Sequence, residues 1–194
     1  MDKLTRQDLY SLEEYATRRA GIRSRVMAHK KDRKVPIGPS ATLYFEDRET
    51  IQYQIQEMLR AERIFEAQGI QEELDAYNPL IPDGTNWKAT FMIEEPDVER
   101  RRVLLAGLVG VEDCVWVRVG RHAAVHAVAD EDLDRSTTEK TASVHFLRFE
   151  LSAQMVQDMK QGASLSIGID HPDYRHQLEP VAAPVCMALA ADLD

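Results

Sequence analysis

Cysteine is scarce in this sequence, and its two copies are not arranged to build a redox cluster. Cys114 and Cys186 lie far apart, and neither belongs to a C-x-x-C motif. An ordinary iron–sulfur cluster needs more thiolate ligands than this chain supplies. Isolated cysteines of this kind are typical of small buried hydrophobes in a reducing compartment. We therefore expect a cytoplasmic protein that folds without a disulfide.

Long apolar runs are also absent. The longest, residues 181–191, is interrupted by Pro184, and it is far shorter than the ~20 residues that a membrane-spanning helix needs. The opening residues, MDKLTRQDLY, lack the apolar core of a signal peptide. The sequence therefore predicts a protein that is neither secreted nor inserted in a membrane.

Three common catalytic motifs are missing as well. The sequence contains no Gly-rich phosphate loop, no G-x-S-x-G nucleophile elbow and no H-E-x-x-H zinc motif. The usual motif evidence is therefore absent for an ATPase, a dinucleotide-dependent dehydrogenase or an α/β-hydrolase. No reaction can be inferred from motifs, and the question of whether the protein is an enzyme stays open.

The chain is long enough and apolar enough to bury a core. It has 194 residues, of which 44% are hydrophobic and 29% are charged, and both shares are ordinary for globular proteins. A chain of this size buries roughly 70% of the surface that its unfolded form exposes. We expect one α+β domain over residues 1–194.

The net charge of -9 is unevenly distributed. Basic residues crowd between positions 18 and 34, where the only acid is Asp32. This basic strip is most simply a helix face that lies in solvent or against the protein's own acidic surface. The alternative is a surface for an acidic partner or for nucleic acid, although the overall acidity and the lack of interleaved aromatic residues disfavour nucleic acid. The strip consists of Arg18, Arg19, Arg23, Arg25, Lys30, Lys31, Arg33 and Lys34.

Hydrophobic spacing predicts alternating groups of helices and strands. Residues 1–35 are expected to form a basic helical arm, joined to the rest by a Pro- and Gly-rich loop at 36–40. A second helix, 48–68, would end at Gly69 and carry Glu62 on its apolar stripe. Hairpin-rich strands follow, with Phe91 and Phe146 expected in the core. This order indicates an α+β fold with a mainly antiparallel sheet covered by helices. The predicted strands span 41–45, 87–93, 115–119, 123–129, 144–151 and 165–169.

Polar side chains concentrate around His145 and His171. Strand alternation places His145 on one face and both Arg148 and Glu150 on the other. Asp170 and His171 stand at a strand end, where side chains can converge on a cleft. Imidazole and carboxylate together could bind Zn, Fe or Mn, and the simpler alternative is that they stabilise a turn. The candidate metal ligands are His145, Asp170 and His171, and the wider candidate polar site comprises Glu62, His145, Arg148, Glu150 and Tyr174.

Four sequence segments carry a family resemblance. They are AYNPLIPDG at 76–84, KATFMIE at 88–94, KTASVHFLRFE at 140–150 and GIDHP at 168–172. As a set they resemble the bacterial family known as domain of unknown function 3501, over nearly the whole chain. The resemblance supplies no catalytic residues. It implies a setting, because genes of this family tend to lie beside those for rubrerythrin, a di-iron peroxide-handling protein, and an Fe–S oxidoreductase.

Three functional hypotheses follow. The first is an accessory or partner-binding protein of that oxidative-stress redox module, whose basic helix docks on rubrerythrin or on the Fe–S oxidoreductase. The second is a metal-dependent enzyme that uses the His and Asp candidates, with Glu62 or Glu150 as a base or further ligand. The third is nucleic-acid binding through the basic strip. A homodimer is the assembly that general frequencies favour.

Overall fold

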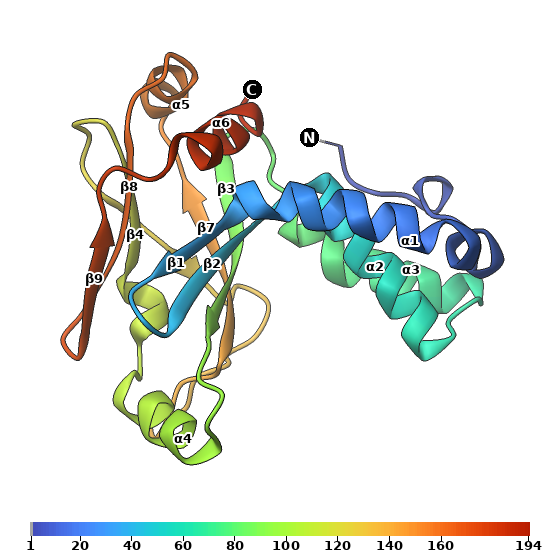
Figure 1. Cartoon of the computed structure of the whole chain (residues 1–194), viewed down its shortest axis with the longest axis horizontal. Coiled ribbons are helices and arrows are strands. Elements are labelled where there is room, and N and C mark those ends of the chain that lie inside the picture. The colour runs from blue at the N-terminus through green and yellow to red at the C-terminus, as the bar shows by residue number, and fades with distance from the viewer. Residues whose placement is uncertain (1) are drawn as a thin grey trace.

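Two antiparallel β-sheets face each other, and a layer of helices stands beside them (Figure 1). The computed structural model describes residues 2–194. The α+β class and the long N-terminal helix are confirmed. Helices are α1 (Leu12–His29), α2 (Arg48–Glu62), α3 (Ala67–Tyr77), α4 (Val98–Gly107), α5 (Ala153–Lys160) and α6 (Ala183–Ala191), with short 3-10 turns η1 (Arg6–Asp8), η2 (Lys30–Arg33), η3 (Asn78–Leu80) and η4 (Val111–Cys114). Strands are β1 (Lys34–Ile37), β2 (Ala41–Glu46), β3 (Asn86–Ile93), β4 (Val115–Val119), β5 (Val125–His126), β6 (Val128–Ala129), β7 (Val144–Glu150), β8 (Leu165–His171) and β9 (Tyr174–Leu178).

The strands divide into two sheets that are connected at both edges. Sheet A has the order β1-β2-β3-β7-β6, and sheet B has the order β5-β4-β8-β9. The chain passes from sheet B to sheet A at Ala127, between β5 and β6. At the other edge, the hydroxyl of Tyr174 in β9 donates to the carbonyl of Ile37 in β1 at 2.8 Å. The sheets therefore enclose a common interior.

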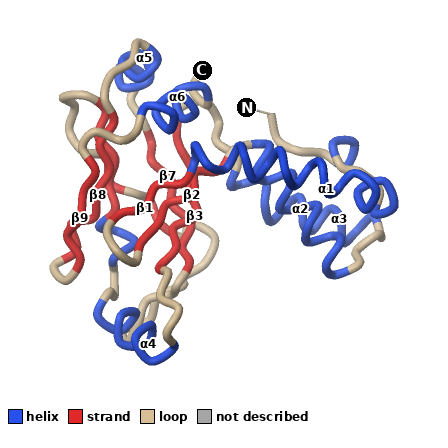
Figure 2. The backbone as a smooth tube through the Cα atoms, in the orientation of Figure 1, coloured by secondary structure: helices blue, strands red, loops and turns tan. Residues whose placement is uncertain are grey.

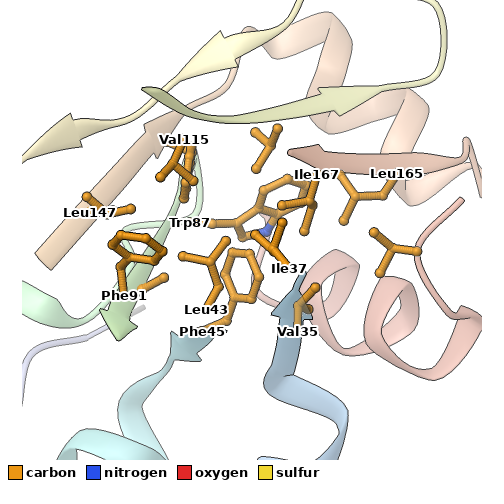
Figure 3. Packing of buried hydrophobic residues seen from close by; sticks show 14 of the residues in the cluster. Val35, Ile37, Leu43, Phe45, Trp87, Phe91, Val115, Leu147, Leu165 and Ile167 are labelled. Carbon is orange, nitrogen blue, oxygen red and sulfur yellow. The ribbon is translucent and has the colours of Figure 1, made fainter. Parts of the chain in front are cut away.

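The main hydrophobic core fills this interior (Figure 3). Alternation along β3 buries Trp87 and Phe91 completely, and Val115 and Ile167 meet them from sheet B. Burying each large side chain contributes about 1.5–3 kcal/mol. The Trp87 indole N–H donates to the carbonyl of Leu189 in α6 at 2.9 Å. The inner face of each sheet is thus covered mainly by the other sheet, where the sequence predicted helices over a single sheet.

The helices α1, α2 and α3 form a helical layer with its own core. Ile55 and Leu59 of α2 pack with Leu74 of α3 in this second cluster. The Asp47 carboxylate caps α2 by accepting the main-chain N–H of Thr50 at 2.8 Å, a contact worth about 1 kcal/mol. Figure 2 shows the layer extending away from the strands, with α4 at one end of the sheets and α5 and α6 at the other. Within residues 2–194 no helix is long and apolar enough to cross a membrane.

The second helix is shorter than the sequence predicted. It ends at Glu62, because Arg63 takes a left-handed conformation with φ of 57° and its N–H bonds the Leu59 carbonyl. Gly69, the predicted stop, lies inside α3. Glu62 is exposed and does not lie on the buried stripe. A left-handed cap is usually Gly or Asn, so an arginine there gave no sequence signal.

Residues 36–40 do not form the predicted linker. Pro36 belongs to β1, an edge strand, where its missing N–H costs no ladder bond. Gly38, with φ of 72°, opens the turn to β2, and a Cβ there would lie 2.6 Å from the His176 ring. The predicted helical arm 1–35 also differs, since α1 ends at His29 and Arg33 is buried.

Candidate functional site

Three side chains with metal-ligating chemistry meet in a buried cluster beside β7. They are Glu112 in η4, Asp130 directly after β6, and His145 in β7. One ligand atom from each lies within 4.8 Å of the others. In the part of the chain that the structure describes, this is the one group of three or more His, Cys, Asp or Glu residues that meets that criterion. We refer to it as the Glu-Asp-His cluster.

Strand geometry places the histidine and the aspartate. Alternation along β7 turns His145 inward, where it is 0% exposed and lies opposite Phe91 of β3. Asp130 takes a left-handed φ of 49°. It is held to β7 because its N–H donates to the Phe146 carbonyl at 2.8 Å and its Oδ1 accepts the Phe146 N–H at 2.9 Å. Such a conformation costs a non-glycine residue about 1–3 kcal/mol and tends to occur at functional sites.

Hydrogen bonds connect the cluster into one network. The Nδ1 atom of His145 lies 2.6 Å from Asp130 Oδ2. Its Nε2 atom lies 2.8 Å from the Thr141 hydroxyl and 3.1 Å from the Ala142 carbonyl. The Thr141 hydroxyl reaches Glu112 Oε2 at 3.1 Å. The two carboxylates are therefore linked through one imidazole and one hydroxyl.

The partners of His145 indicate where its protons lie. Asp130 Oδ2 beside Nδ1 can only accept when ionised, and so can the Ala142 carbonyl beside Nε2. When the Thr141 hydroxyl donates to Glu112, its oxygen also accepts from Nε2. Both ring nitrogens of His145 therefore face hydrogen-bond acceptors, and the Thr141 hydroxyl links the ring to Glu112.

Outer contacts hold each carboxylate in place. The Ser136 hydroxyl donates to Glu112 Oε1, which leaves Glu112 with two hydroxyl partners. Arg135 donates to Asp130 Oδ1 at 3.1 Å and to Asp132, whose pKa it lowers to about 2. The Arg135 guanidinium also lies 4.5 Å from the centre of the Phe146 ring. Arg135 thus connects the buried cluster with the outer side of β7.

Two of the predicted metal ligands lie outside the cluster. Asp170 is exposed at the end of β8. The His171 ring bonds main-chain groups, with Nε2 3.1 Å from the Val109 carbonyl and Nδ1 accepting the Asp173 N–H at 3.2 Å. Of the set His145, Asp170 and His171, only His145 enters the cluster.

The remaining candidates of the wider polar site are dispersed. Arg148 and Glu150 point away from His145, as strand alternation predicted, and they pair with each other at 2.6 Å. Arg148 also forms an ion pair with Glu131. Tyr174 connects the sheet edges, and burial raises the pKa of its hydroxyl. Glu62 lies on the helical layer.

Sequence reasoning missed Glu112 and Thr141, and it did not connect Asp130 with His145. Asp130 stands in the acidic run Asp-Glu-Asp, which is typical of a solvated loop. Glu112 lies 18 residues before it, in a 3-10 turn. Neither shares a spacing motif with His145, because the contact depends on the pairing of β6 with β7. Only a sheet register could have joined them.

Several residues of the basic strip contact the protein's own acids. Arg19 donates two hydrogen bonds of 2.7 Å to Glu57, and this contact lowers the pKa of that carboxyl to about 2. Arg25 pairs with Glu49 at 2.8 Å. Arg33 is buried, donates twice to Asp192 at 2.7 Å and forms an ion pair with Asp47 at 2.9 Å. These three arginines therefore pair with acids of the same chain.

The rest of the basic strip has looser contacts. Arg18 pairs with Glu14 at 3.0 Å, and Arg23 reaches the Tyr53 hydroxyl at 3.2 Å. Lys30 lies over the Tyr53 ring and Lys34 over the Tyr44 ring. Lys31 is exposed. The free positive surface is therefore smaller than the sequence indicates.

Comparison with known proteins identifies the family. The model of the family described as "Protein of unknown function (DUF3501)" matches residues 3–193. A crystal structure of a novel protein of unknown function from Burkholderia pseudomallei K96243 is 54% identical, with a TM-score of 0.95 and full coverage of both chains. A search of curated proteins gives no match. The chain belongs to the DUF3501 family of proteins of unknown function.

Proposed function

We propose that this protein binds a divalent transition-metal ion at the Glu-Asp-His cluster and serves as an accessory protein of a bacterial oxidative-stress redox module. The observation that carries the metal site is the convergence of Glu112, Asp130 and His145, from three separate segments, within 4.8 Å in a buried position. Buried carboxylates are costly unless a cation or hydrogen bonds compensate them. A bound ion would supply that compensation.

The ligand types limit which metal ions the cluster would bind. One imidazole with two carboxylates suits Zn, Fe or Mn, whereas a thiolate set would favour softer ions. The hydroxyls of Ser136 and Thr141 orient Glu112, and Arg135 orients Asp130. Contacts of this kind commonly position metal ligands and tune their basicity.

Metal and proton compete for His145 under this proposal. A histidine nitrogen that binds metal must give up its proton. Because both nitrogens of His145 face acceptors in the metal-free network, metal entry would release a proton. Metal affinity should therefore fall as pH is lowered.

The redox setting rests on the family. The motifs quoted above resemble that family, and the resemblance implies a setting beside rubrerythrin and an Fe–S oxidoreductase. Cys114 and Cys186 are both free, and burial raises the pKa of each thiol. Weakly ionised thiols are poor ligands and nucleophiles, which favours an accessory role over electron transfer through a cysteine cluster.

Metal content is the first measurement. Protein purified without a His tag or chelators, under anaerobic conditions, should contain nearly one equivalent of metal by elemental mass spectrometry. His145→Ala and Glu112→Gln should lose it, since each removes a ligand. His171→Ala is the matched control and should keep it. Metal-free wild-type protein that also fails to take up added Zn, Fe or Mn would remove the metal proposal.

A further inference from the structure

A groove runs along the outer face of sheet A, between the sheet and the helical layer. Its first segment has a volume of about 480 Å³ and is lined by Met58, Tyr77 and Leu80 from the helical side and by Lys88 and Phe146 from the sheet. A second segment of similar volume is also lined by Tyr77, Leu80 and Phe146. Each volume suits a small-molecule site, and the shared lining makes the two segments one elongated groove.

The sheet wall of the second segment is more apolar than an outer sheet face usually is. Solvated faces of antiparallel sheets carry polar residues. Here the outward positions at this wall include Met92, Val144 and Phe146, which are only partly exposed. Met27 and Ile51 face them from the helices. Lys30, Glu46, Gln54 and Thr90 also line this segment, so a long apolar body would find its contacts along the strip formed by Met92, Val144 and Phe146.

The first segment holds one cation, Lys88, that forms no direct ion pair within the described chain, although the charges of Asp83, Glu131 and Glu150 lie near it. Arg135 and Arg148 are both occupied by carboxylates of the 131–132 loop. Lys88 forms no ion pair with a carboxylate of residues 2–194, and its ammonium donates to the Pro79 carbonyl. An ammonium has three donors, so donors remain. Burial, followed by the nearby charge of Arg148, lowers the pKa of Lys88.

The acids at the rim limit the charge of a ligand. Glu73, Asp75, Glu131 and Asp132 also line the first segment. Like charges repel, so a phosphate or other polyanion would be disfavoured next to them. A single negative charge that reaches Lys88 would avoid most of this cost.

We propose that the groove binds a long-chain alkyl monocarboxylate. Its carboxylate lies at Lys88, and its chain passes Phe146 toward Met92 and Val144. This inference stands apart from the metal proposal, because it uses the outer side of β7 and needs no ion at the cluster.

Calorimetric titration of delipidated protein with octanoate, decanoate and laurate, below their micelle concentrations, tests the proposal. One saturable site is expected, with affinity rising about fourfold for each added methylene. Lys88→Gln should weaken laurate binding about tenfold and leave dodecanol binding unchanged. Lys140→Gln, on an exposed loop residue, is the matched control and should bind like wild type.

A variant that fills the groove gives a second test of the proposal. Ala76→Trp places a bulky ring into the first segment from an exposed position of α3, and it should abolish laurate binding while circular dichroism shows a folded protein. The proposal is overturned if no carboxylate binds saturably, or if Lys88→Gln or Ala76→Trp binds laurate as wild type does. Tighter binding of 1-naphthoate than of laurate would also overturn it, because the ligand would then be aromatic.

Discussion

At the scale of single residues, the His145 imidazole is sealed from solvent between two carboxylates. The side chain is 0% exposed, and its ring nitrogens lie near Asp130 and Glu112. Removing one partner from such a group leaves an uncompensated charge in the interior, which is far more costly than losing a surface pair.

Asp130→Asn and Glu112→Gln should each lower the free energy of unfolding by about 3–5 kcal/mol. Both changes keep the side-chain shape, so the loss reports on charge. Urea denaturation at neutral pH measures it. Asp134→Asn, on an exposed residue of the same loop, is the control and should change stability by less than ~0.5 kcal/mol. Losses below ~1 kcal/mol in both cluster variants would show that the network is not charged.

Phe91 and Phe146 should differ sharply when each is replaced by Ala. Phe91 is fully buried between the sheets, so its loss should cost about 3–5 kcal/mol. Phe146 faces outward and is only partly buried against Arg135, so its loss should cost about 1–2 kcal/mol. Urea denaturation of both variants measures the two losses of unfolding free energy. Equal losses would contradict the inward position of Phe91 and the outward position of Phe146.

These two phenylalanines show what strand alternation could and could not predict. Alternation correctly separated His145 from Arg148 and Glu150. Alternation also places Phe146 on the same face as Arg148 and Glu150, so the expectation of a core Phe146 did not follow the pattern. Alternation could not say which residue of β3 lies opposite each residue of β7, and in the structure Phe91 pairs with His145. The two aromatic side chains therefore lie on different faces. The sequence-based expectation that both are core residues was wrong for Phe146.

At the scale of elements, one partly buried ion pair between α1 and α2 involves Arg19 and Glu57. Glu57 accepts from Arg19 and from the Tyr15 hydroxyl, each at 2.7 Å. The Arg19 hydrogen bond is the main cause that lowers the pKa of Glu57 from 4.5 to about 2. A lowered carboxyl pKa contributes stability above the unfolded value, and this contribution is lost as pH falls through the folded value.

Glu57→Gln should therefore lower stability by about 1–2 kcal/mol at pH 7, after allowance for partial exposure. The difference from wild type should shrink between pH 4.5 and about 2, because wild-type Glu57 is protonated there. Urea denaturation across this range measures it. Glu62→Gln, exposed at the end of the same helix, should follow the wild-type curve. A gap that stays constant with pH would refute this role of the ion pair.

Elements with strong periodicity could be predicted, and the division into sheets could not. The strands at 86–93 and 144–150 follow alternating burial patterns, and those at 41–46 and 115–119 are short, mostly buried runs. The change of sheet depends on β5 and β6, which have two residues each. Two residues carry no measurable period, so two separate sheets could not be predicted from the sequence. The placement of Asp130 beside His145 depends on the same short strands.

At the scale of the whole molecule, the basic strip contributes less external charge than its composition indicates. Arg19, Arg25 and Arg33 neutralise acids of the same chain. For a protein with a net charge of -9 and few free cations on this face, we expect little attraction for nucleic acid. Lys31 belongs to the exposed remainder, and we expect this remainder to steer a protein partner with an acidic surface.

If the protein is an accessory of the redox module, it should co-elute with the co-expressed rubrerythrin or Fe–S oxidoreductase in sizing chromatography at low salt. The complex should dissociate as salt rises, since exposed charges more than a Debye length apart are screened. Lys31→Glu should weaken the complex about threefold to tenfold, whereas Lys140→Glu makes the same charge change on a distant loop and should not. No co-elution at low salt would remove the accessory role, and weakening by Lys140→Glu instead of Lys31→Glu would move the docking surface away from α1 and η2.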